Sequence, residues 1–444
     1  WPRRTPFREF KGNVAHSNYD GFMFDRNINP NNTFGVTGNA HMPKENPADP
    51  NSRTVETVFE NLTAYKNANG GIWGRGEMHV FRNVKVADNA MGYTHASGSA
   101  GRDPFTSKVV DSLFVGETEN VGNPKTDAEK AYGRTFPKPQ MPDFPIRGYE
   151  YYDYRHDVEN VTFRNYQDNA TRKTGALSYL MYTSAGVSTE NAIEGAKFVN
   201  AKRVYFPPME RKWGNDNLSG VAWKAAAIHD KDGSVSGVAN SYIIINDGVF
   251  DNISTDTTAC DIRRDWNAAV CKGDIGRLTF GGPGGPPRAA PAARAGDAPS
   301  SLGAGAPITA AGPGGPSAGG PPGGGARPPA QPPVILSRNG RQYETTNTNV
   351  RAGTEIKVTT ERPTLNINLT ELDKGSWVIF ELQGFTTAAA GTEQSSLDAL
   401  RKASETSFYK DNGSLWVKVV SNGDSARGTV GFGPGSGTSL QVSR

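Results

Sequence analysis

A repeat of 22 residues is the sequence feature that most constrains the fold. Residues 59–70 and 81–92 share Phe, Asn, an apolar residue, a second Asn and Gly at the same relative positions. Parts of this pattern recur at residues 18–24, 110–115 and 158–163 and, in degraded form, at 244–250. A period of about 20–50 residues is typical of proteins whose structural repeats stack in one direction.

Each repeat has the pattern of short strands joined by bends. Polar and apolar residues alternate within a unit, as at residues 83–86, and this alternation is typical of a β-strand. Asn and Gly follow, and both tolerate the positive φ angles of a bend. Leucine-rich repeats need more Leu per unit, and propeller blades need about 40 residues. We therefore predict an all-β chain with a parallel β-helix over residues 1–280, Asn ladders between rungs, and inserted loops at 30–55, 120–145 and 207–222.

The composition changes sharply after residue 280. Residues 281–333 contain 15 Gly, 14 Pro and 13 Ala, which is typical of a flexible, disordered linker. Strand-like runs separated by turn signals resume afterwards, for example at 376–382 and 414–420, and residues 396–404 suit one short helix. We predict a small β-sandwich-like C-terminal domain over residues 334–444.

Charge and hydropathy give no support to a nucleic-acid partner or to a membrane-spanning helix. The chain has 48 Lys and Arg against 45 Asp and Glu, a net charge of +3, and no region of it is strongly basic. Nothing in this balance favours a nucleic-acid partner. No apolar run approaches the roughly 20 residues that a membrane-spanning helix needs. We therefore predict no membrane span in this chain.

The segment from His229 to Ser234 is the sharpest local motif. Asp230 and Asp232 stand two residues apart, directly before the turn residue Gly233. Carboxylates spaced in this way can bind a hard cation such as Ca²⁺, can act in catalysis together with His229, or can simply form a turn. Phosphate loops, serine elbows and His-Glu zinc motifs are absent, and six histidines argue against a multi-histidine metal centre.

Two further residues lie at expected bends of the coil. His16 is either a packed, hydrogen-bonded residue or a base. Arg147 follows a Pro-rich loop, and it could pair with a carboxylate of a bound substrate or with Asp153 or Asp157 of the chain itself.

The two cysteines enclose another candidate. Cys260 and Cys271 can form one short-loop disulfide in an oxidising compartment, or remain buried thiols. Between them, Asp265 and Trp266 form either a site on which a sugar stacks or a packed corner.

Seven motifs of this sequence resemble, in the same order, motifs of a known protein family. They lie at residues 10–19, 64–67, 87–92, 111–117, 144–148, 229–236 and 260–271. Together they resemble the family of cell-migration-inducing hyaluronan-binding proteins and transmembrane cell-surface hyaluronidases. The resemblance covers residues 7–280 and resumes at 341–420.

The resemblance implies a right-handed parallel β-helix that binds or acts on hyaluronan outside the cell, as a secreted or cell-surface protein. The insert at 281–333 departs from the family pattern and is typical of a bacterial chain, so other uronic-acid polysaccharides become expected substrates as well. The positions that match the family, and that we take as site candidates, are His16, Arg147, His229, Asp230, Asp232 and Asp265.

Two functions follow from these expectations, with a purely structural role as the third. The first is an extracellular depolymerase, either a hydrolase with a carboxylate pair or a polysaccharide lyase, with His229, Asp230 and Asp232 as catalytic residues and Ca²⁺ as the candidate cofactor. His16, Arg147, Asp265 and Trp266 would then bind the substrate. The second is a non-catalytic glycan-binding or adhesion module. Either would work as a monomer on an acidic polysaccharide.

Overall fold

A computed structural model of the chain describes most of both predicted domains. The described residues are 2–24, 27–28, 34–35, 41–97, 107–120, 143–153, 155–170, 172–179, 188–207, 227–245, 259–281, 332–338, 340–344, 347–423 and 437–444. The predicted linker, apart from its first residue and its last two, and most of the predicted loops at 120–145 and 207–222 lie outside these residues. Residues 34–35 and 41–55 of the predicted loop at 30–55 are described.

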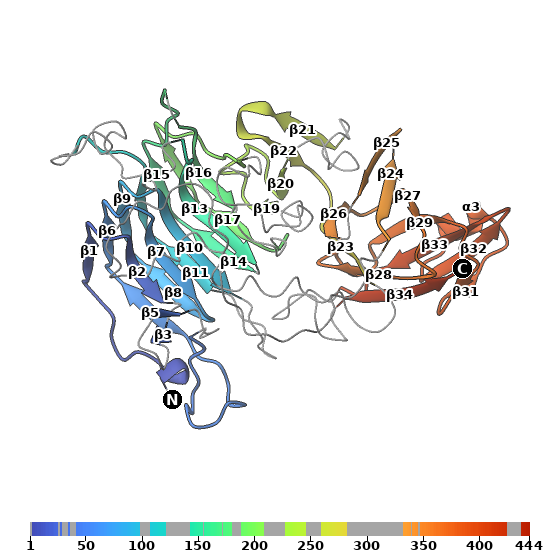
Figure 1. The fold of residues 1–444 in the computed structure, drawn as a ribbon, viewed down its shortest axis with the longest axis horizontal. Coiled ribbons are helices and arrows are strands. Elements are labelled where there is room, and N and C mark those ends of the chain that lie inside the picture. Colours follow the sequence, from blue (N-terminus) through green and yellow to red (C-terminus); the bar gives the residue numbers. More distant parts are fainter. Residues whose placement is uncertain are drawn as a thin grey trace, which may run out of the picture.

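Three sheets, called I, II and III here, form the N-terminal part of the molecule (Figure 1). Sheet I consists of β1 (Val14–His16), β6 (Thr63–Tyr65), β9 (Lys85–Ala87), β12 (Leu113–Val115), β15 (Thr162–Arg164) and β18 (Lys197–Val199), in that order. Sheet II consists of β2 (Asp20–Phe24), β7 (Gly70–Arg75), β10 (Met91–Ser97), β13 (Ile146–Asp153) and β16 (Thr174–Tyr179). Sheet III begins with β5 (Thr57–Glu60), β8 (His79–Arg82), β11 (Ser107–Val110), β14 (His156–Glu159), β17 (Ala192–Glu194) and β19 (Ala227–Asp230). A short 3-10 helix, η1 (Pro2–Arg4), precedes them, and β3 (Asn27–Ile28) pairs with β4 (Phe34–Gly35).

The chain visits the three sheets in turn, so each circuit adds one strand to each sheet. Phe59 lies opposite Phe81, 22 residues later, which is the spacing of the sequence repeat. Val109 lies opposite Val158, 49 residues later, because a long connection is inserted between β12 and β13. All of these pairs are parallel. The predicted all-β class is confirmed, and the N-terminal part is a coil of parallel sheets like that of a β-helix.

Asparagines form the bends between strands, as predicted. Asn61, Asn83, Asp111 and Asn160 have φ angles of 56°, 50°, 51° and 53°, and they occupy the same corner of successive circuits. Asn83 Nδ2 donates to Asn61 Oδ1 at 2.6 Å. Short polar side chains tolerate this left-handed conformation better than branched ones do. The Asn positions of the repeat are therefore fixed by backbone geometry.

The glycines of the repeat have a different role from the one we expected. We predicted that they supply positive φ, yet Gly21, Gly70 and Gly92 of the repeat, and likewise Gly71 and Gly148, are not among the residues with positive φ. A Cβ on Gly92 would lie 2.5 Å from the carbonyl oxygen of Gly148, and one on Gly71 would lie 2.6 Å from that of Gly92. These glycines are required because successive circuits approach each other too closely for any side chain.

The parallel coil ends after β19. Three antiparallel strands, β20 (Ser241–Ile245), β22 (Ala268–Cys271) and β21 (Cys260–Arg263), complete sheet III. Residues 244–250 were predicted to be a degraded parallel repeat, and this is wrong for the described residues Ile244 and Ile245, which belong to antiparallel β20. Alternating apolar residues indicate a strand but do not indicate its direction.

Two further sheets, IV and V, share one apolar core and form the C-terminal part. Sheet IV has the order β26 (Asn347–Arg351), β23 (Ile275–Gly281), β28 (Thr364–Thr370), β34 (Thr438–Ser443) and β30 (Thr387–Ala388). Sheet V has the order β25 (Arg341–Glu344), β24 (Val334–Arg338), β27 (Thr354–Thr360), β29 (Trp377–Gln383), β33 (Ser414–Val420), β32 (Ser407–Asp411) and β31 (Thr392–Glu393). The predicted short helix is confirmed as α3 (Leu397–Lys402), where the Ser396 side chain accepts from the N–H of Ala399.

Strand β23 belongs to sheet IV although it precedes the Gly/Pro/Ala insert. It pairs with β26 and β28, so the insert separates two strands of the C-terminal part in the sequence. Only residues 272–274 connect β22 of the coil to β23. The boundaries at 1–280, 281–333 and 334–444 otherwise remain a prediction.

Among the described residues, no helix is long and apolar enough to cross a membrane.

Candidate functional site

The predicted motif at residues 229–236 forms the turn that ends the parallel coil. Asp230, at the end of β19, is fully buried and accepts hydrogen bonds from the N–H and the hydroxyl of Ser236, both at 2.7 Å. Asp232 accepts from the N–H of Gly195 at 2.7 Å and from the N–H of Ser234 at 3.0 Å. Each carboxylate thus holds a different part of the turn in place.

These contacts fit a turn better than a cation site. Burial raises the pKa of Asp232, but hydrogen bonds from Gly195 and Ser234 outweigh it, so that the pKa lies below its ordinary value. His229 is occupied as well, because its Nε2 lies 2.8 Å from Asn240 Oδ1. In the part of the chain that the structure describes, no three His, Cys, Asp or Glu side chains come together as metal ligands. The predicted Ca²⁺ site at Asp230 and Asp232 stays a prediction.

The other predicted site residues lie apart from this turn. His16 is exposed on β1, the first strand of sheet I, where its ring stacks on Tyr65 with centroids 4.8 Å apart. Asp265 is exposed on the 3-10 helix η4 (Arg264–Trp266). Trp266 is buried in the core of the coil, with the Arg263 guanidinium 5.6 Å from its ring, which favours the packed-corner alternative. The structure does not gather these residues into one site.

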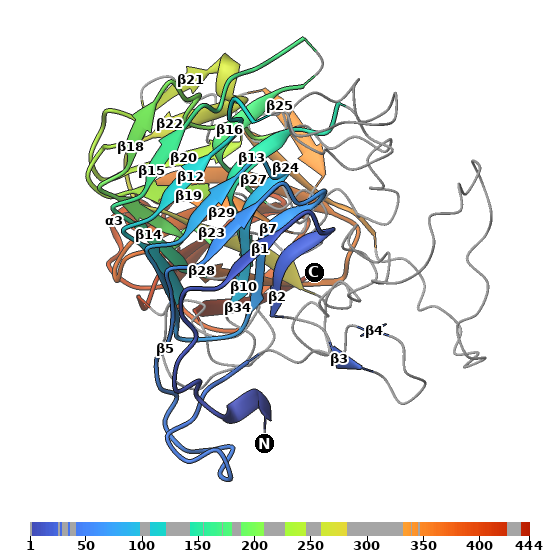
Figure 2. The ribbon, with the colours of Figure 1, turned by 90° about the vertical axis from the view of Figure 1, so that its left-hand side faces the viewer.

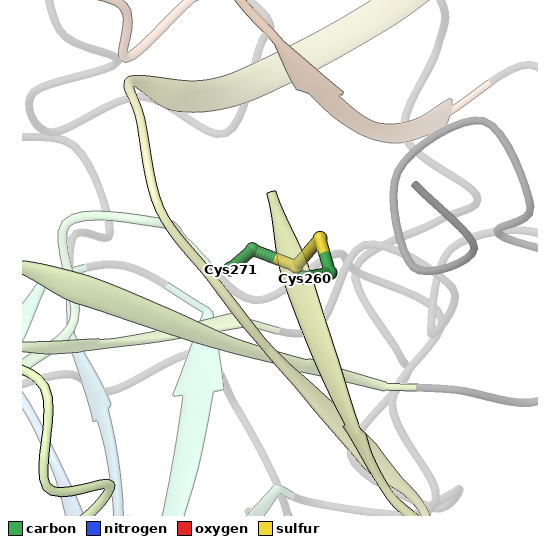
Figure 3. Close-up of a disulfide and its surroundings, with 2 residues drawn as sticks. All are labelled: Cys260 and Cys271. Carbon is green, nitrogen blue, oxygen red and sulfur yellow. A yellow bond between two sulfur atoms is a disulfide. The ribbon is translucent and has the colours of Figure 1, made fainter. Parts of the chain in front are cut away.

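Cys260 and Cys271 form a disulfide between β21 and β22 (Figure 3). The two residues lie opposite each other in the antiparallel pair. The disulfide therefore joins the start of β21 to the end of β22, from which the chain continues into β23. It leaves no free cysteine among the described residues.

Arg147 lies in a polar cluster on the side of sheet II that faces away from the coil core. Its Nε is 2.6 Å from Glu150 Oε1, and both side chains are fully buried. The hydroxyl of Thr94 donates to Glu150 Oε2 at 2.8 Å. The neighbouring Tyr149 and Tyr151 belong to the coil core, so Glu150, between them in sequence, faces the opposite way. Arg147 pairs with Glu150 and not with Asp157, which pairs with Arg155; the side chain of Asp153, the other predicted partner, lies outside the described part of the structure.

The guanidinium of Arg147 is only partly satisfied. Its terminal nitrogens, Nη1 and Nη2, are buried and have no hydrogen-bond partner among the described residues. A buried cation without hydrogen bonds is costly, so such groups normally bind water, an ion or a ligand. The two free nitrogens of an Arg match the two oxygens of a carboxylate.

Aromatic side chains lie on the same face. Trp73 is opposite Thr94 in the sheet, and Thr94 is opposite Glu150. The rings of Trp73 and Tyr152 are 6.1 Å apart, and the Arg75 guanidinium lies 5.6 Å from the Tyr152 ring. The face thus combines a buried cation with two nitrogens that lack hydrogen-bond partners, a carboxylate and aromatic rings, which are the groups that recognise an acidic sugar. We call this set the sheet II cluster: Thr94, Arg147, Glu150, Trp73, Tyr152 and Arg75.

Sequence reasoning singled out Arg147 as a candidate, but it did not find the residues that contact Arg147 in the structure. Glu150 lies in the run of residues 149–154, where the tyrosines dominate the pattern. Nothing in the local sequence shows that Thr94, 56 residues earlier, is its neighbour. The alternation of Tyr149, Glu150 and Tyr151 was the available signal, because a carboxylate between two core positions must face outward.

A line of histidines runs through the inside of the coil, with His95 on β10 of sheet II and His79 and His156 on β8 and β14 of sheet III. His41 Nδ1 lies 2.8 Å from His79 Nε2, and His79 Nδ1 lies 3.0 Å from His95 Nε2. The His95 and His156 rings are 4.7 Å apart, and His156 Nδ1 is hydrogen-bonded to the hydroxyl of Tyr149. Because His79 uses both ring nitrogens along the line, these imidazoles do not converge on one point as metal ligands do.

The histidine line is neutral at neutral pH. His41 Nε2 faces the carbonyl oxygen of Thr5 at 3.0 Å, and a carbonyl can only accept, so this nitrogen carries the proton. His41 Nδ1 is then unprotonated and accepts a hydrogen bond from His79 Nε2. His79 Nδ1 in turn accepts from His95 Nε2. Burial lowers the pKa of His79 and of His95 well below 6.5 and lowers that of His156 to about 3. The sequence offered no signal for this line, since its members lie in separate circuits.

Comparison with known proteins agrees with the motifs. Over 62% of its length the chain is 30% identical to the human cell surface hyaluronidase CEMIP2 and 30% identical to the human cell migration-inducing and hyaluronan-binding protein. It is 27% identical, over a similar share, to a cell surface hyaluronidase of Danio rerio. The chain spans about a fifth of the length of these three relatives. No family model matches it.

The resemblance predicted from seven motifs is thus confirmed. Over about three fifths of its length, this chain is homologous to the cell-migration-inducing hyaluronan-binding proteins and cell surface hyaluronidases.

Proposed function

We propose that this protein binds and depolymerises hyaluronan or a related uronic-acid polysaccharide, with the sheet II cluster as its site. The observation that carries the proposal is Arg147, a buried guanidinium with two unpaired nitrogens beside Glu150. The names of the homologues, hyaluronidase and hyaluronan-binding protein, support the choice of polysaccharide.

The cluster supplies groups for both binding and chemistry. Arg147 would pair with the carboxylate of a uronate unit through Nη1 and Nη2, and the buried rings of Trp73 and Tyr152 lie on the same face of the sheet. Glu150, held by Thr94 and Arg147, is the acid–base candidate. Hydrolysis needs two carboxylates, whereas elimination needs one base beside a group that neutralises the uronate. One carboxylate beside an Arg matches elimination more closely.

A depolymerisation assay tests the proposal. The chain is incubated with high-molecular-weight hyaluronan, with and without Ca²⁺, and polymer length is followed together with the appearance of an unsaturated uronate at the new chain end. We expect shortening that is lost in Glu150→Gln and Arg147→Lys. Asp230→Ala and Asp232→Ala test the alternative catalytic position in the turn after β19. Shortening that survives in Glu150→Gln but not in these two variants would move the chemistry to that turn.

A non-catalytic binding module is the second candidate, and one observation favours it. The side chains of Arg147 and Glu150 are completely buried. Buried ionic groups more often stabilise the structure than take part in a reaction. Retention of unshortened hyaluronan by the chain would support this function.

The proposal also includes the cellular location of the protein and the handedness of its parallel coil. We infer an extracellular or cell-surface location, because the Cys260–Cys271 disulfide is stable in an oxidising environment. We also infer a right-handed coil, since connections between parallel strands are right-handed in about 98% of cases. We expect the protein to act as a monomer.

A further inference from the structure

The outer face of sheet I carries two rows of side chains. The strand register aligns one row across the six strands and a second row two residues further along each strand. The first row is Val14, Thr63, Lys85, Leu113, Thr162 and Lys197, and the second is His16, Tyr65, Ala87, Val115, Arg164 and Val199. We call these twelve residues the sheet I face.

Positive charge dominates the sheet I face. Lys85, Arg164 and Lys197 are exposed, and none of the twelve positions is acidic. Within the described part of the chain, no ion pair neutralises any of the three. A balanced chain that places three cations and no anion on one sheet face has a local field that attracts anions.

The face is also uncovered. Val14, Leu113 and Val199 are 60%, 36% and 47% exposed, which is unusual for three apolar residues of one sheet. The C-terminal sheets lie on the opposite side of the molecule in Figure 1, and the strands of sheet I face the viewer in Figure 2. The stacked rings of His16 and Tyr65 add a flat aromatic surface at one end.

The cations are spaced along the axis of the coil. Lys85 and Lys197 lie three strands apart, or about 14 Å at the usual strand spacing, with Arg164 on the strand before Lys197. A polymer that carries one carboxylate in each repeating unit presents charges at regular intervals along its length. Apolar and aromatic side chains between the cations suit the apolar faces of sugar rings.

We infer that the sheet I face binds an extended acidic polysaccharide along the coil axis, as a second site distinct from the sheet II cluster. This inference rests on the proposed function, because it takes its polymer from there. The face holds a long chain by charge and by ring contacts, while Arg147 recognises a single uronate.

The test compares long and short hyaluronan. The variant Lys85→Ser/Arg164→Ser/Lys197→Ser removes the three cations, and Lys272→Ser/Lys374→Ser/Lys402→Ser removes three exposed lysines elsewhere as the matched control. We expect the first variant to bind immobilised high-molecular-weight hyaluronan at least tenfold more weakly than the native chain, and the control to bind it within twofold. Binding of a hyaluronan tetrasaccharide, which fits the sheet II cluster alone, should not change.

A charge-retaining variant separates the loss of positive charge from misfolding as the cause of weaker binding. Lys85→Arg/Arg164→Lys/Lys197→Arg should restore binding, and the serine variant should keep the native thermal unfolding midpoint. If the serine variant binds long hyaluronan as the native chain does, the sheet I inference is overturned while the proposed function stands. If the native chain binds hyaluronan of no length, both are overturned. Equal binding of single-stranded DNA and hyaluronan would show a general polyanion surface and overturn the polysaccharide assignment.

Discussion

Ionisable side chains in the middle of the coil are the least expected feature at the scale of single residues. Four of the six histidines lie in one line inside the coil, although a coil of parallel sheets normally fills its centre with apolar side chains. They can stay there because each imidazole is neutral and most ring nitrogens have a partner. Neutrality is therefore a condition of the fold, and it is lost in acid.

The histidine line predicts a loss of stability below pH 6.5. His156 has its pKa lowered from 6.5 to about 3 by burial, so between these values the unfolded chain binds a proton that the folded chain does not. Stability must fall as the pH falls through this window, by about 2 kcal/mol between pH 7 and pH 5 for this one group. Denaturant unfolding at several pH values measures it.

A matched pair of variants isolates the effect. His156→Gln should weaken the dependence of stability on pH and leave the part that His79 and His95 contribute, whereas His16→Gln, at an exposed position, should leave it as in the native chain. An unchanged pH dependence in His156→Gln would contradict the assignment.

The Arg147–Glu150 pair predicts that substitutions of its two residues have non-additive effects on the free energy of unfolding. Removing one partner leaves the other as an uncompensated buried charge, so Arg147→Met should cost about 3–5 kcal/mol of unfolding free energy. The double variant Arg147→Met/Glu150→Gln removes both charges and should cost less than the sum of the two single variants. A double-mutant cycle by chemical denaturation measures the coupling, and additive costs would show that the two groups do not interact.

At the scale of strands and bends, the sequence predicts what is periodic and misses what depends on neighbouring circuits. The period of 22, the Asn bends and the short helix after Ser396 follow from local patterns and are present. The close approach at Gly92 depends on Gly148 in the next circuit, and the reversal at β20 depends on how the coil ends. In the same way, Arg147 could be selected from its loop, but its partner Glu150 required the paired strands.

Two buried asparagines of successive circuits, Asn67 and Asn89, form a hydrogen-bonded ladder, which predicts that Asn89 does not tolerate substitution. Asn89 Oδ1 accepts from the N–H and the side-chain amide of Asn67, both at 3.0 Å, and Asn89 Nδ2 donates to the carbonyl of Ala64 at 3.0 Å. Asn89→Ala should cost about 1–3 kcal/mol for each buried group that loses its partner. Asn13→Ala, at an exposed position, should stay within about 0.5 kcal/mol of the native chain. Equal thermal midpoints for the two variants would show that the ladder contributes nothing.

At the scale of the whole molecule, one carboxylate joins the coil to the C-terminal sheets. Glu371 accepts from the Ser188 hydroxyl at 3.0 Å and from the N–H and hydroxyl of Thr189, both at 2.8 Å, and it lies 3.8 Å from Arg277 of β23. Its φ of 63° is uncommon for a residue other than Gly. A side chain held in this way on a left-handed backbone indicates a fixed joint between the two parts.

The joint predicts that the two parts unfold together. In Glu371→Ala the Cβ remains, so the backbone strain is kept while the contacts to Ser188 and Thr189 are lost. Scanning calorimetry should show one transition for the native chain and two separated transitions for this variant. Glu355→Ala, which removes an exposed ion pair with Arg401 inside the C-terminal part, should keep the single transition. Two transitions in the native chain would show that the joint does not couple the parts.

The central claim is that the coil recognises an acidic polysaccharide, and equilibrium binding against oligosaccharide length tests it most directly. Hyaluronan oligosaccharides of increasing length are titrated into the native chain by calorimetry, with uncharged chitin oligosaccharides of the same lengths alongside. We predict measurable binding of the short hyaluronan oligosaccharides through Arg147, affinity that rises with length as the sheet I face is spanned, and weakening by salt because the contacts are ionic. Equal affinity for the uncharged series, or no binding of hyaluronan at any length, would contradict the account.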